Sequence, residues 1–287
     1  MIDSHEFLGD TGPEVPFEEI RPIQLGILDA ITGFCDAHGL RYYISGGTLL
    51  GAVRHGGYIP WDDDIDLNMP RPDCDRLLQL TGGRIGENIE IGAADGPIRH
   101  SVPFVRAYDT DYLLRLESEK GVVRAYSNVS IDIFPIDGLP RREWASRVHY
   151  FFAKSLVILR RVAYYRELTG DWDWHRLIRF AAYLPAKAVG WRTWNRLIQK
   201  LSRMYAYEKS EKVGVVCCCV HTNEERMGRD VYGEARAMPF EDRAYKAPQK
   251  PEEYLERIYG DYMKLPPREK QIRHHHYTVF HLKEARK

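Results

Sequence analysis

The chain has 287 residues, of which 44% are hydrophobic and 29% charged, and its 41 basic side chains balance its 41 acidic ones. These values are typical of a folded globular protein and exclude a disordered or fibrous chain. No apolar run is long enough to cross a bilayer, and the amino-terminal residues lack the layout of a signal peptide, so we expect a cytoplasmic protein.

The five cysteines, Cys35, Cys74 and Cys217–Cys219, show no C-x-x-C spacing. We expect reduced thiols, as in a cytosolic compartment, with the triplet inside an apolar strand from Lys212 to Val220. Neighbouring residues of a strand point to opposite faces, which disfavours a zinc site in the triplet.

The first predicted element is a helix from Pro16 to Gly39, in which apolar residues recur near a helical period. A short strand from Arg41 to Ser45 follows. Gly46, Gly47 and Thr48 then turn the chain into a helix covering about Leu49 to His55. Backbone N–H groups at such a glycine turn and helix start are suited to phosphate oxygens.

Four carboxylates, Asp62, Asp63, Asp64 and Asp66, follow within five residues. Alternating apolar residues around them predict a half-buried strand on which Asp64 and Asp66 share a face, roughly 6–7 Å apart. Mutual repulsion at this spacing favours a bound multivalent cation over a solvated acidic loop. The spacing also resembles a calcium loop, but such a loop needs glycine and glutamate where this chain has Leu67 and Asp73.

A helix beginning at Pro70-Arg71-Pro72 and ending near Leu80 is predicted next. Residues 82–137 consist of short apolar runs broken by glycine, which indicates strands. In the last of these runs, Ile131 and Ile133 lie on one face and Asp132 on the other. From periodicity alone, Asp132 is either a third ligand beside Asp64 and Asp66 or an outward-facing surface carboxylate.

The segment from Arg141 to Arg203 is helical in its periodicity and strongly basic, with fourteen Lys/Arg and four Asp/Glu. It also carries five of the six tryptophans. One interpretation is a surface that meets anionic lipid or an amphiphilic acceptor. The alternative is that the aromatic residues form core and the charges a solvated face. Nucleic acid is disfavoured, because the remainder of the chain is acidic and carries no nucleic-acid motif.

The last part of the chain is predicted to contain a loop-rich stretch from Tyr232 to Ala247 and a helix from Pro251 to about Asp261. Leu265-Pro266-Pro267 ends that helix. We expect His274-His275-His276 to lie on the surface, because consecutive histidines rarely ligate one ion.

Three motifs stand out in the chain: the run G-G-T-L-L-G-A-V-R-H-G-G-Y-I-P-W-D-D-D-I-D-L from Gly46 to Leu67, Ile131–Pro135, and Tyr259–Pro267. Together they resemble the LicD family of phosphocholine-type transferases. The resemblance spans about residues 20–276. It implies an α/β (α+β) nucleotidyltransferase-like fold, with a mixed sheet, flanking helices and a helical insertion.

On this basis we divide the chain into four parts: a flexible amino terminus (1–16), a nucleotidyltransferase-like catalytic core (17–140), a basic, aromatic-rich helical insertion (141–206), and a carboxy-terminal part that completes the domain (207–287).

The resemblance implies a metal-dependent transferase that moves phosphocholine or a similar substituted phosphate from a CDP-activated donor to a hydroxyl of a glycan or lipid-linked glycan, releasing CMP. It assigns catalysis and Mg²⁺ or Mn²⁺ binding to Asp64, Asp66 and Asp132, of which Asp132 also takes the acceptor proton. Nucleotide and phosphate binding fall to Gly46, Gly47, Thr48, Arg54 and His55. Asp62, Asp63 and Trp61 are expected to lie around the metal-binding carboxylates and support them.

Three alternatives remain open from sequence. In the first, the same site belongs to a phosphoribitol or phosphoglycerol transferase. In the second, it belongs to a nucleotidyltransferase that releases pyrophosphate. In the third, the chain is an inactive glycan- or lipid-binding module, but the intact carboxylates argue against this. Trp61 or Tyr58 is close enough in sequence to contact a choline group. We further expect peripheral contact with the inner face of the plasma membrane through residues 141–206, and no nucleic-acid partner.

Overall fold

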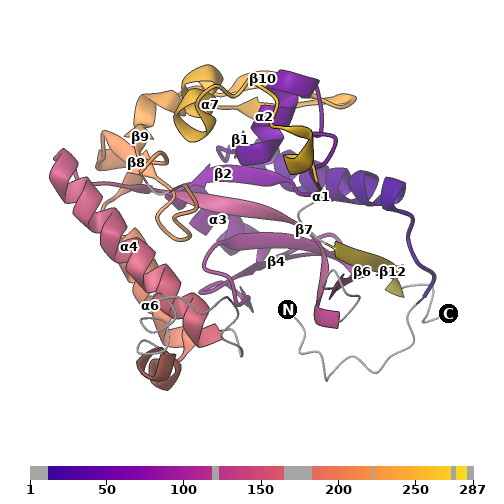
Figure 1. Ribbon diagram of the computed structural model, residues 1–287, viewed down its shortest axis with the longest axis horizontal. Helices are drawn as coiled ribbons and strands as arrows, with labels where there is room; N and C mark the ends of the chain where they lie inside the picture. The colour runs from indigo at the N-terminus through magenta and orange to yellow at the C-terminus, as the bar shows by residue number, and fades with distance from the viewer. Residues whose placement is uncertain (1–11, 118–122, 165–182, 222, 273–275, 283–287) are drawn as a thin grey trace.

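The computed structural model describes residues 12–117, 123–164, 183–221, 223–272 and 276–282. Its centre is a mixed sheet with the strand order β1-β2-β7-β6-β4-β3 (Figure 1). The strands of this path are β1 (Tyr43–Ile44), β2 (Asp66–Pro70), β3 (Arg84–Ile85), β4 (Ile89–Ala93), β6 (Val105–Glu117) and β7 (Val123–Gly138). Strands β2 and β7 are parallel, whereas β1 runs antiparallel to β2 and β6 antiparallel to β7. The predicted α/β class with a mixed sheet is confirmed.

Later parts of the chain add strands to this sheet. Strand β12 (His276–His281) pairs antiparallel with β6, and β8 (Lys212–Gly214) pairs with the end of β7 and with β9 (Met227–Gly228). The short β5 (Ile98–Arg99) pairs with β4. Residues near the carboxy terminus therefore share a sheet with the acidic strands.

The predicted helices around the sheet are confirmed: α1 (Phe17–Ala37), α2 (Gly46–His55), α3 (Arg71–Thr81) and α7 (Pro251–Tyr259). The helical period of α1 places Ile27, Leu28 and Ile31 in the core, each at most 1% exposed. Burial of such side chains stabilises the fold by about 1.5–3 kcal/mol each. Helix α2 begins at Gly46, so the diglycine is its first turn rather than a separate loop.

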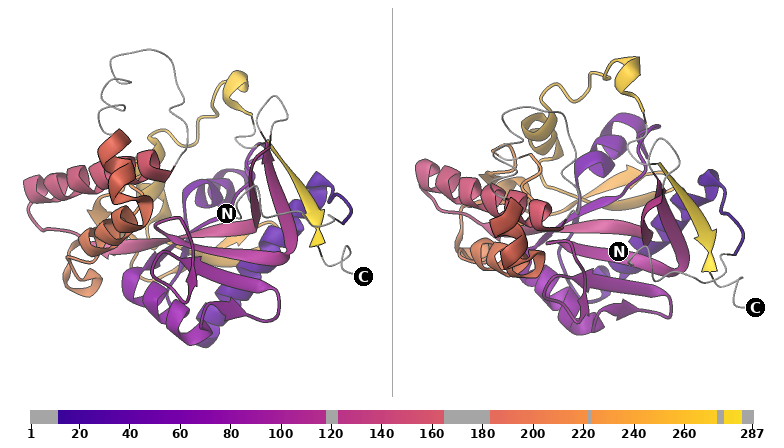
Figure 2. Two further views of the ribbon diagram at one scale, coloured as in Figure 1. Left: turned by 90° about the horizontal axis from the view of Figure 1, so that it is seen from below. Right: turned by 60° about the horizontal axis from the view of Figure 1, so that its bottom comes forward.

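Two helices, α4 (Glu143–Tyr164) and α6 (Trp191–Ser202), pack side by side at one end of the molecule, away from β12 (Figures 1 and 2). A helical segment at 183–189 precedes α6, and Gly190, with a φ of +79°, separates the two. Gly170, Trp172 and Trp174 lie outside the described residues.

The predicted strand from Lys212 to Val220 is wrong beyond Gly214. Residues 215–219 form turns, with Cys219 at a φ of +47°, and their side chains pack beneath α4 and α6. Their apolar character therefore reflects burial against helices rather than a sheet ladder. All five cysteines are buried free thiols.

The stretch from Tyr232 to Ala247 is not loop-rich as predicted, because β10 (Arg236–Phe240) and β11 (Arg243–Ala247) form an antiparallel hairpin. Its tip residue, Glu241, donates its backbone N–H to the Gly56 carbonyl, and its Oε1 accepts the Tyr58 N–H. The hairpin thus holds the second Gly-Gly of the first motif, a contact between segments far apart in sequence.

His274 and His275 lie outside the described residues, and His276 begins β12. In the part of the chain that the structure covers, none of the helices combines the length and hydrophobicity needed to cross a bilayer.

Candidate active site

Helix α1 fixes the loop that carries the acidic residues. One nitrogen of Arg21 donates to the carbonyl oxygens of Ile59 and Asp62, both at 3.2 Å, and the Gln24 amide donates to the Asp63 carbonyl at 2.8 Å. These side chains satisfy backbone acceptors that belong to no strand. The loop therefore has a defined course before it enters β2, and sequence reasoning had missed both anchoring residues.

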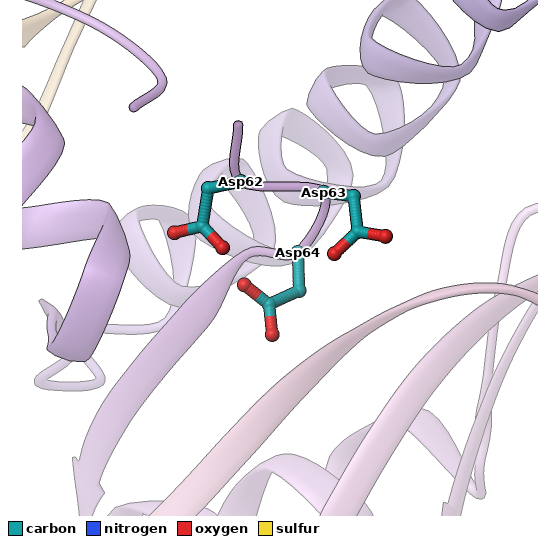
Figure 3. Close-up of side chains that lie close together, drawn as sticks. All are labelled: Asp62, Asp63 and Asp64. Atoms are coloured by element: carbon teal, nitrogen blue, oxygen red, sulfur yellow. The ribbon is translucent and has the colours of Figure 1, made fainter. Parts of the chain in front are cut away.

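Asp62, Asp63 and Asp64 each offer a carboxylate oxygen, and these oxygens lie within 4.8 Å of one another (Figure 3). The carboxyls of Asp62 and Asp64 are hydrogen-bonded to each other. Strand β2 begins at Asp66, so the predicted placement of Asp64 and Asp66 on one strand face is wrong: Asp64 belongs to the preceding loop. The two residues still converge, because the loop brings Asp64 close to Asp66 from outside the strand.

Asp66 and Asp132 occupy matched positions on the parallel neighbours β2 and β7. Ile131 and Ile133 are buried on the opposite face of β7, which confirms the predicted alternation. The parallel pairing thus brings the carboxylate of the second motif beside that of the first. Asp132 therefore lies beside Asp66 in the same site and is not an isolated surface residue.

Arg106 on β6 faces Asp132 across the antiparallel pairing of β6 and β7. Its Nε and Nη2 lie 2.6 and 2.8 Å from the two Asp132 carboxylate oxygens. Burial alone would lower the pKa of Arg106, but the charges of Asp132, Asp66 and Asp64 raise it overall. Sequence reasoning missed Arg106, because a basic residue in a strand run gives no signal until the strand register is known.

The carboxylates repel one another strongly. Although Asp64 is solvent-exposed, desolvation of its carboxyl and the charges of Asp62, Asp63 and Asp132 raise its pKa to about 7. Burial and the charges of Asp64, Asp132 and Asp62 raise the pKa of Asp66 well above its usual range. The site therefore favours binding of protons or of a cation. Carboxylate oxygens at this density fit a hard divalent cation.

The two glycines that begin α2 make room for these carboxylates. A Cβ atom on Gly46 would lie 2.7 Å from Asp66 Oδ2, and one on Gly47 would lie 2.4 Å from Asp62 Oδ2. Gly46 also has a φ of +52°, which favours glycine. The positive end of the α2 dipole stabilises negative charge placed there.

Thr48 is buried, and its Oγ1 accepts the Asp66 backbone N–H at 2.8 Å. Gly46 donates its N–H to the Tyr254 hydroxyl at 3.3 Å. Both groups thus position the acidic strand and its neighbours. Their predicted role in phosphate binding stays a prediction.

Arg54 lies at the other end of α2. Its Nη1 donates to the Tyr262 carbonyl at 2.8 Å and its Nε to His55 Nε2 at 2.9 Å. The His55 ring in turn lies edge-on to Trp61, with 6.1 Å between ring centroids. These contacts join the first motif to the third, since Tyr262 belongs to Tyr259–Pro267.

Tyr58 is 6% exposed, and the Arg21 guanidinium lies over its ring, 4.6 Å from the centroid. Its hydroxyl donates to Gln24 Oε1 at 3.3 Å. The suggestion that Tyr58 contacts a choline group is therefore wrong, because the ring belongs to the core.

A pocket of about 70 Å³ lies beside Asp66 and Gly46. Its remaining walls come from β7, α7 and residues within 215–221 and 223–232, including Glu225, Tyr232 and Tyr254. No sequence signal indicated these residues, because they reach the acidic strand only through the tertiary fold.

Residues 39–151, which contain both acidic strands, match the family model described as LicD/FKTN/FKRP, nucleotidyltransferase domain. These residues therefore form a LicD-family domain, and the family that the motifs resemble is confirmed. Over 271 residues the chain is 26% identical to the lipopolysaccharide cholinephosphotransferase LicD of Haemophilus influenzae, an alignment that covers 91% of this chain and 97% of that protein.

A second similarity is local. Over 60 residues the chain is 43% identical to the ribitol 5-phosphate transferase FKRP of Homo sapiens and to that of Mus musculus. This alignment covers 21% of the present chain and 12% of each FKRP. The relatives thus include one similar along nearly its whole length and two that share only a short region.

Proposed function

We propose that this protein transfers phosphocholine, or a similar substituted phosphate, from a CDP-activated donor to a hydroxyl of a glycan or lipid-linked glycan, with release of CMP. The relatives are phosphate-group transferases, and the chain is an enzyme of that type. The observation that carries the finer proposal is the convergence of Asp62, Asp64, Asp66 and Asp132, with pKa values of Asp62, Asp64 and Asp66 raised by desolvation and mutual repulsion. Phosphoryl transfer needs a cation to offset the negative charge of the donor, and carboxylates gathered in this way would hold one.

Asp64, Asp66 and Asp132 would hold Mg²⁺ or Mn²⁺. Asp62 and Asp63 lie close enough to Asp64 to contribute an oxygen. When bound, such an ion stabilises negative charge on the diphosphate. Arg106 binds both oxygens of Asp132 and so fixes the direction of its carboxylate.

The contact with a lipid-linked acceptor is supported by the exposed face of α4. Trp144, Phe151 and Phe152 are 64%, 68% and 56% exposed, and Val148 and Ile158 extend the same stripe. Exposed basic residues line one edge of this stripe, namely Arg147, Lys154 and Arg161. Apolar side chains beside basic ones suit a surface with anionic lipid headgroups, which supports peripheral contact with the inner face of the plasma membrane as part of this proposal.

The experiment that tests the proposal is incubation of the protein with Mg²⁺, glycan acceptors that carry free hydroxyls and, separately, CDP-choline, CDP-ethanolamine, CDP-ribitol and CDP-glycerol. Release of CMP from one donor, lost with Asp66→Asn, is the expected result. Release of pyrophosphate from CTP, with no CMP from any donor, would instead identify a nucleotidyltransferase. Absence of both reactions with glycan acceptors present would favour the non-enzymatic module.

A further inference from the structure

The pocket beside Asp66 contains a buried carboxylate that the proposed mechanism does not use. Glu225 is 6% exposed, and its Oε1 accepts the His221 backbone N–H at 3.1 Å. Its Oε2 is shielded from solvent and has no hydrogen-bond partner among the residues that the structure describes. Burial raises the pKa of Glu225 to about 8, so the side chain needs a neighbouring cation to favour its charged form at neutral pH. A buried acceptor without a partner is costly, which points to a ligand that supplies the missing interaction.

Two tyrosines form a rigid aromatic wall of the same pocket. Tyr232 and Tyr254 lie edge-on, with 6.1 Å between their centroids. The Asn68 side-chain amide donates to both hydroxyls, at 3.0 and 3.4 Å, and the Gly46 N–H also reaches Tyr254. The hydroxyls are thus engaged within the protein, so that the rings are held in place.

The rest of the lining is mainly apolar, with Phe134, Met227 and Ile258 among its residues. A volume of about 70 Å³ is several times what one water molecule needs. A polyol headgroup would leave several hydroxyls without partners against such walls, at a cost for each. A methylated ammonium has no such requirement, and it is attracted both by aromatic faces and by a carboxylate.

We propose that this pocket binds the alkylammonium headgroup of the donor, with Glu225 as its counter-ion, and so selects an amine-bearing substituted phosphate over phosphoribitol or phosphoglycerol. The inference rests on the proposed function for the place of the phosphate beside Asp66. The preference of the pocket for an organic cation is independent of turnover and is measurable without a nucleotide.

The first test uses the wild-type chain and two small probes of the same shape. Choline is expected to bind, as measured by calorimetry, whereas its uncharged carbon analogue 3,3-dimethyl-1-butanol is expected to bind at least tenfold more weakly. Phosphocholine is likewise expected to bind more tightly than glycerol 1-phosphate or ribitol 5-phosphate. Equal binding of the charged and uncharged probes would overturn the proposal, and this test does not depend on any variant.

The second test compares Glu225→Gln with Glu224→Gln, a matched change at an exposed neighbour. Choline affinity should fall at least tenfold with Glu225→Gln and stay unchanged with Glu224→Gln. Glu225→Asp, which keeps the charge, should recover part of the affinity. Unaltered choline binding by a folded Glu225→Gln protein would refute the role of Glu225.

The outcomes also separate this inference from the proposed function. If no CDP donor yields CMP but choline binding depends on Glu225, the proposed function fails and the inference stands. If CDP-ribitol yields CMP while choline does not bind, the proposed function stands in its ribitol form and the inference fails.

Discussion

Arg106 on β6 holds both carboxylate oxygens of Asp132 on β7, at 2.6 and 2.8 Å. Each side chain is about one-fifth exposed, so the pair is largely shielded from solvent. Because Asp132 pairs in register with Asp66, the guanidinium also faces the other carboxylates of the site. Arg106 therefore offsets repulsion that the acidic residues would otherwise exert on the folded protein.

Arg106→Gln should lower the free energy of unfolding by about 1.5–3 kcal/mol, the usual contribution of hydrogen bonds to charged groups. Turnover should be lost as well, because Asp132 would no longer be oriented. Denaturant unfolding of Arg106→Gln, Asp132→Asn and the double variant measures their coupling. The double variant should be more stable than the sum of the single effects predicts. Additive effects would show that the pair makes no specific contribution.

Asp66→Asn should abolish turnover without destabilising the metal-free protein. The pKa of Asp66 is raised well above its usual range by burial and by Asp64, Asp132 and Asp62, so removing its charge relieves repulsion. We expect an unfolding midpoint equal to or above that of wild type. Asp242→Asn, a change at an exposed carboxylate of the hairpin tip, is the control. Activity of Asp66→Asn within a few-fold of wild type would remove Asp66 from the catalytic site.

Stability in the absence of divalent ions should fall as pH rises from about 4 to 7. The folded pKa of Asp64 is raised to about 7 from 3.8, so in this range the folded state retains a proton that the unfolded state has released. The stabilisation that protonated Asp64 gives the folded state is complete at low pH and is lost as pH approaches 7. Thermal midpoints at several pH values should show a weaker decline for Asp64→Asn. Added Mg²⁺ should raise the wild-type midpoint at pH 7.5, and equal slopes for the two proteins would contradict the assignment.

Local sequence was sufficient for the main helices and for the acidic motif. The period of Ile20, Ile27 and Ile31 predicts α1, and the alternation around Asp132 predicts its orientation on β7. Both signals depend only on which side of an element is buried. The apolar run at Val215–Cys219 was misleading, because burial beneath helices and burial within a sheet produce the same composition.

The rest of the site depends on pairings between distant segments. Arg106 becomes a partner of Asp132 only through the register of β6 with β7, and Glu225 reaches the pocket beside Asp66 through turns without periodicity. The start of β2 was also misplaced, since apolar alternation continues into the loop that holds Asp64. A single sequence records side-chain preference along the chain but not strand register, so these contacts required the fold.

Arg54→Lys should weaken donor binding by about tenfold, equivalent to one lost charge-assisted hydrogen bond of about 1.5 kcal/mol. The guanidinium spans the Tyr262 carbonyl and His55 Nε2, and its planar fork leaves further N–H groups for phosphate. An ammonium cannot reproduce this geometry. Calorimetry with the CDP donor gives the affinity, and a wild-type unfolding midpoint would show that the fold is intact. Unchanged affinity would show that Arg54 only holds the third motif, Tyr259–Pro267, in place.

The last prediction concerns membrane docking through the exposed stripe of α4, defined by Trp144, Val148, Phe151, Phe152 and Ile158. These residues share one helix face, while Tyr150 and Val157 on the opposite side are buried. Arg160 is also buried and donates to Asn195 Oδ1 at 3.0 Å, so it is structural and cannot contact lipid. The basic residues suited to headgroup contact are instead Arg147, Lys154 and Arg161, which are exposed.

Binding to vesicles that contain anionic lipid should therefore weaken as salt rises through the physiological range, because the basic residues act through screened charge. Reversal to Glu at Arg147, Lys154 and Arg161 should reduce binding by about a hundredfold or more, at about 1 kcal/mol for each residue. Phe151→Ser with Phe152→Ser should reduce vesicle binding independently of salt.

Reversal at the exposed Arg76, Arg99 and Lys209, which lie outside α4, is the matched control. Turnover on a soluble acceptor fragment should be unchanged in all these variants, since none lies in the acidic site. Vesicle sedimentation that shows no binding at low salt, or equal losses for the α4 and control reversals, would leave α4 as an ordinary solvated helix and favour a soluble acceptor.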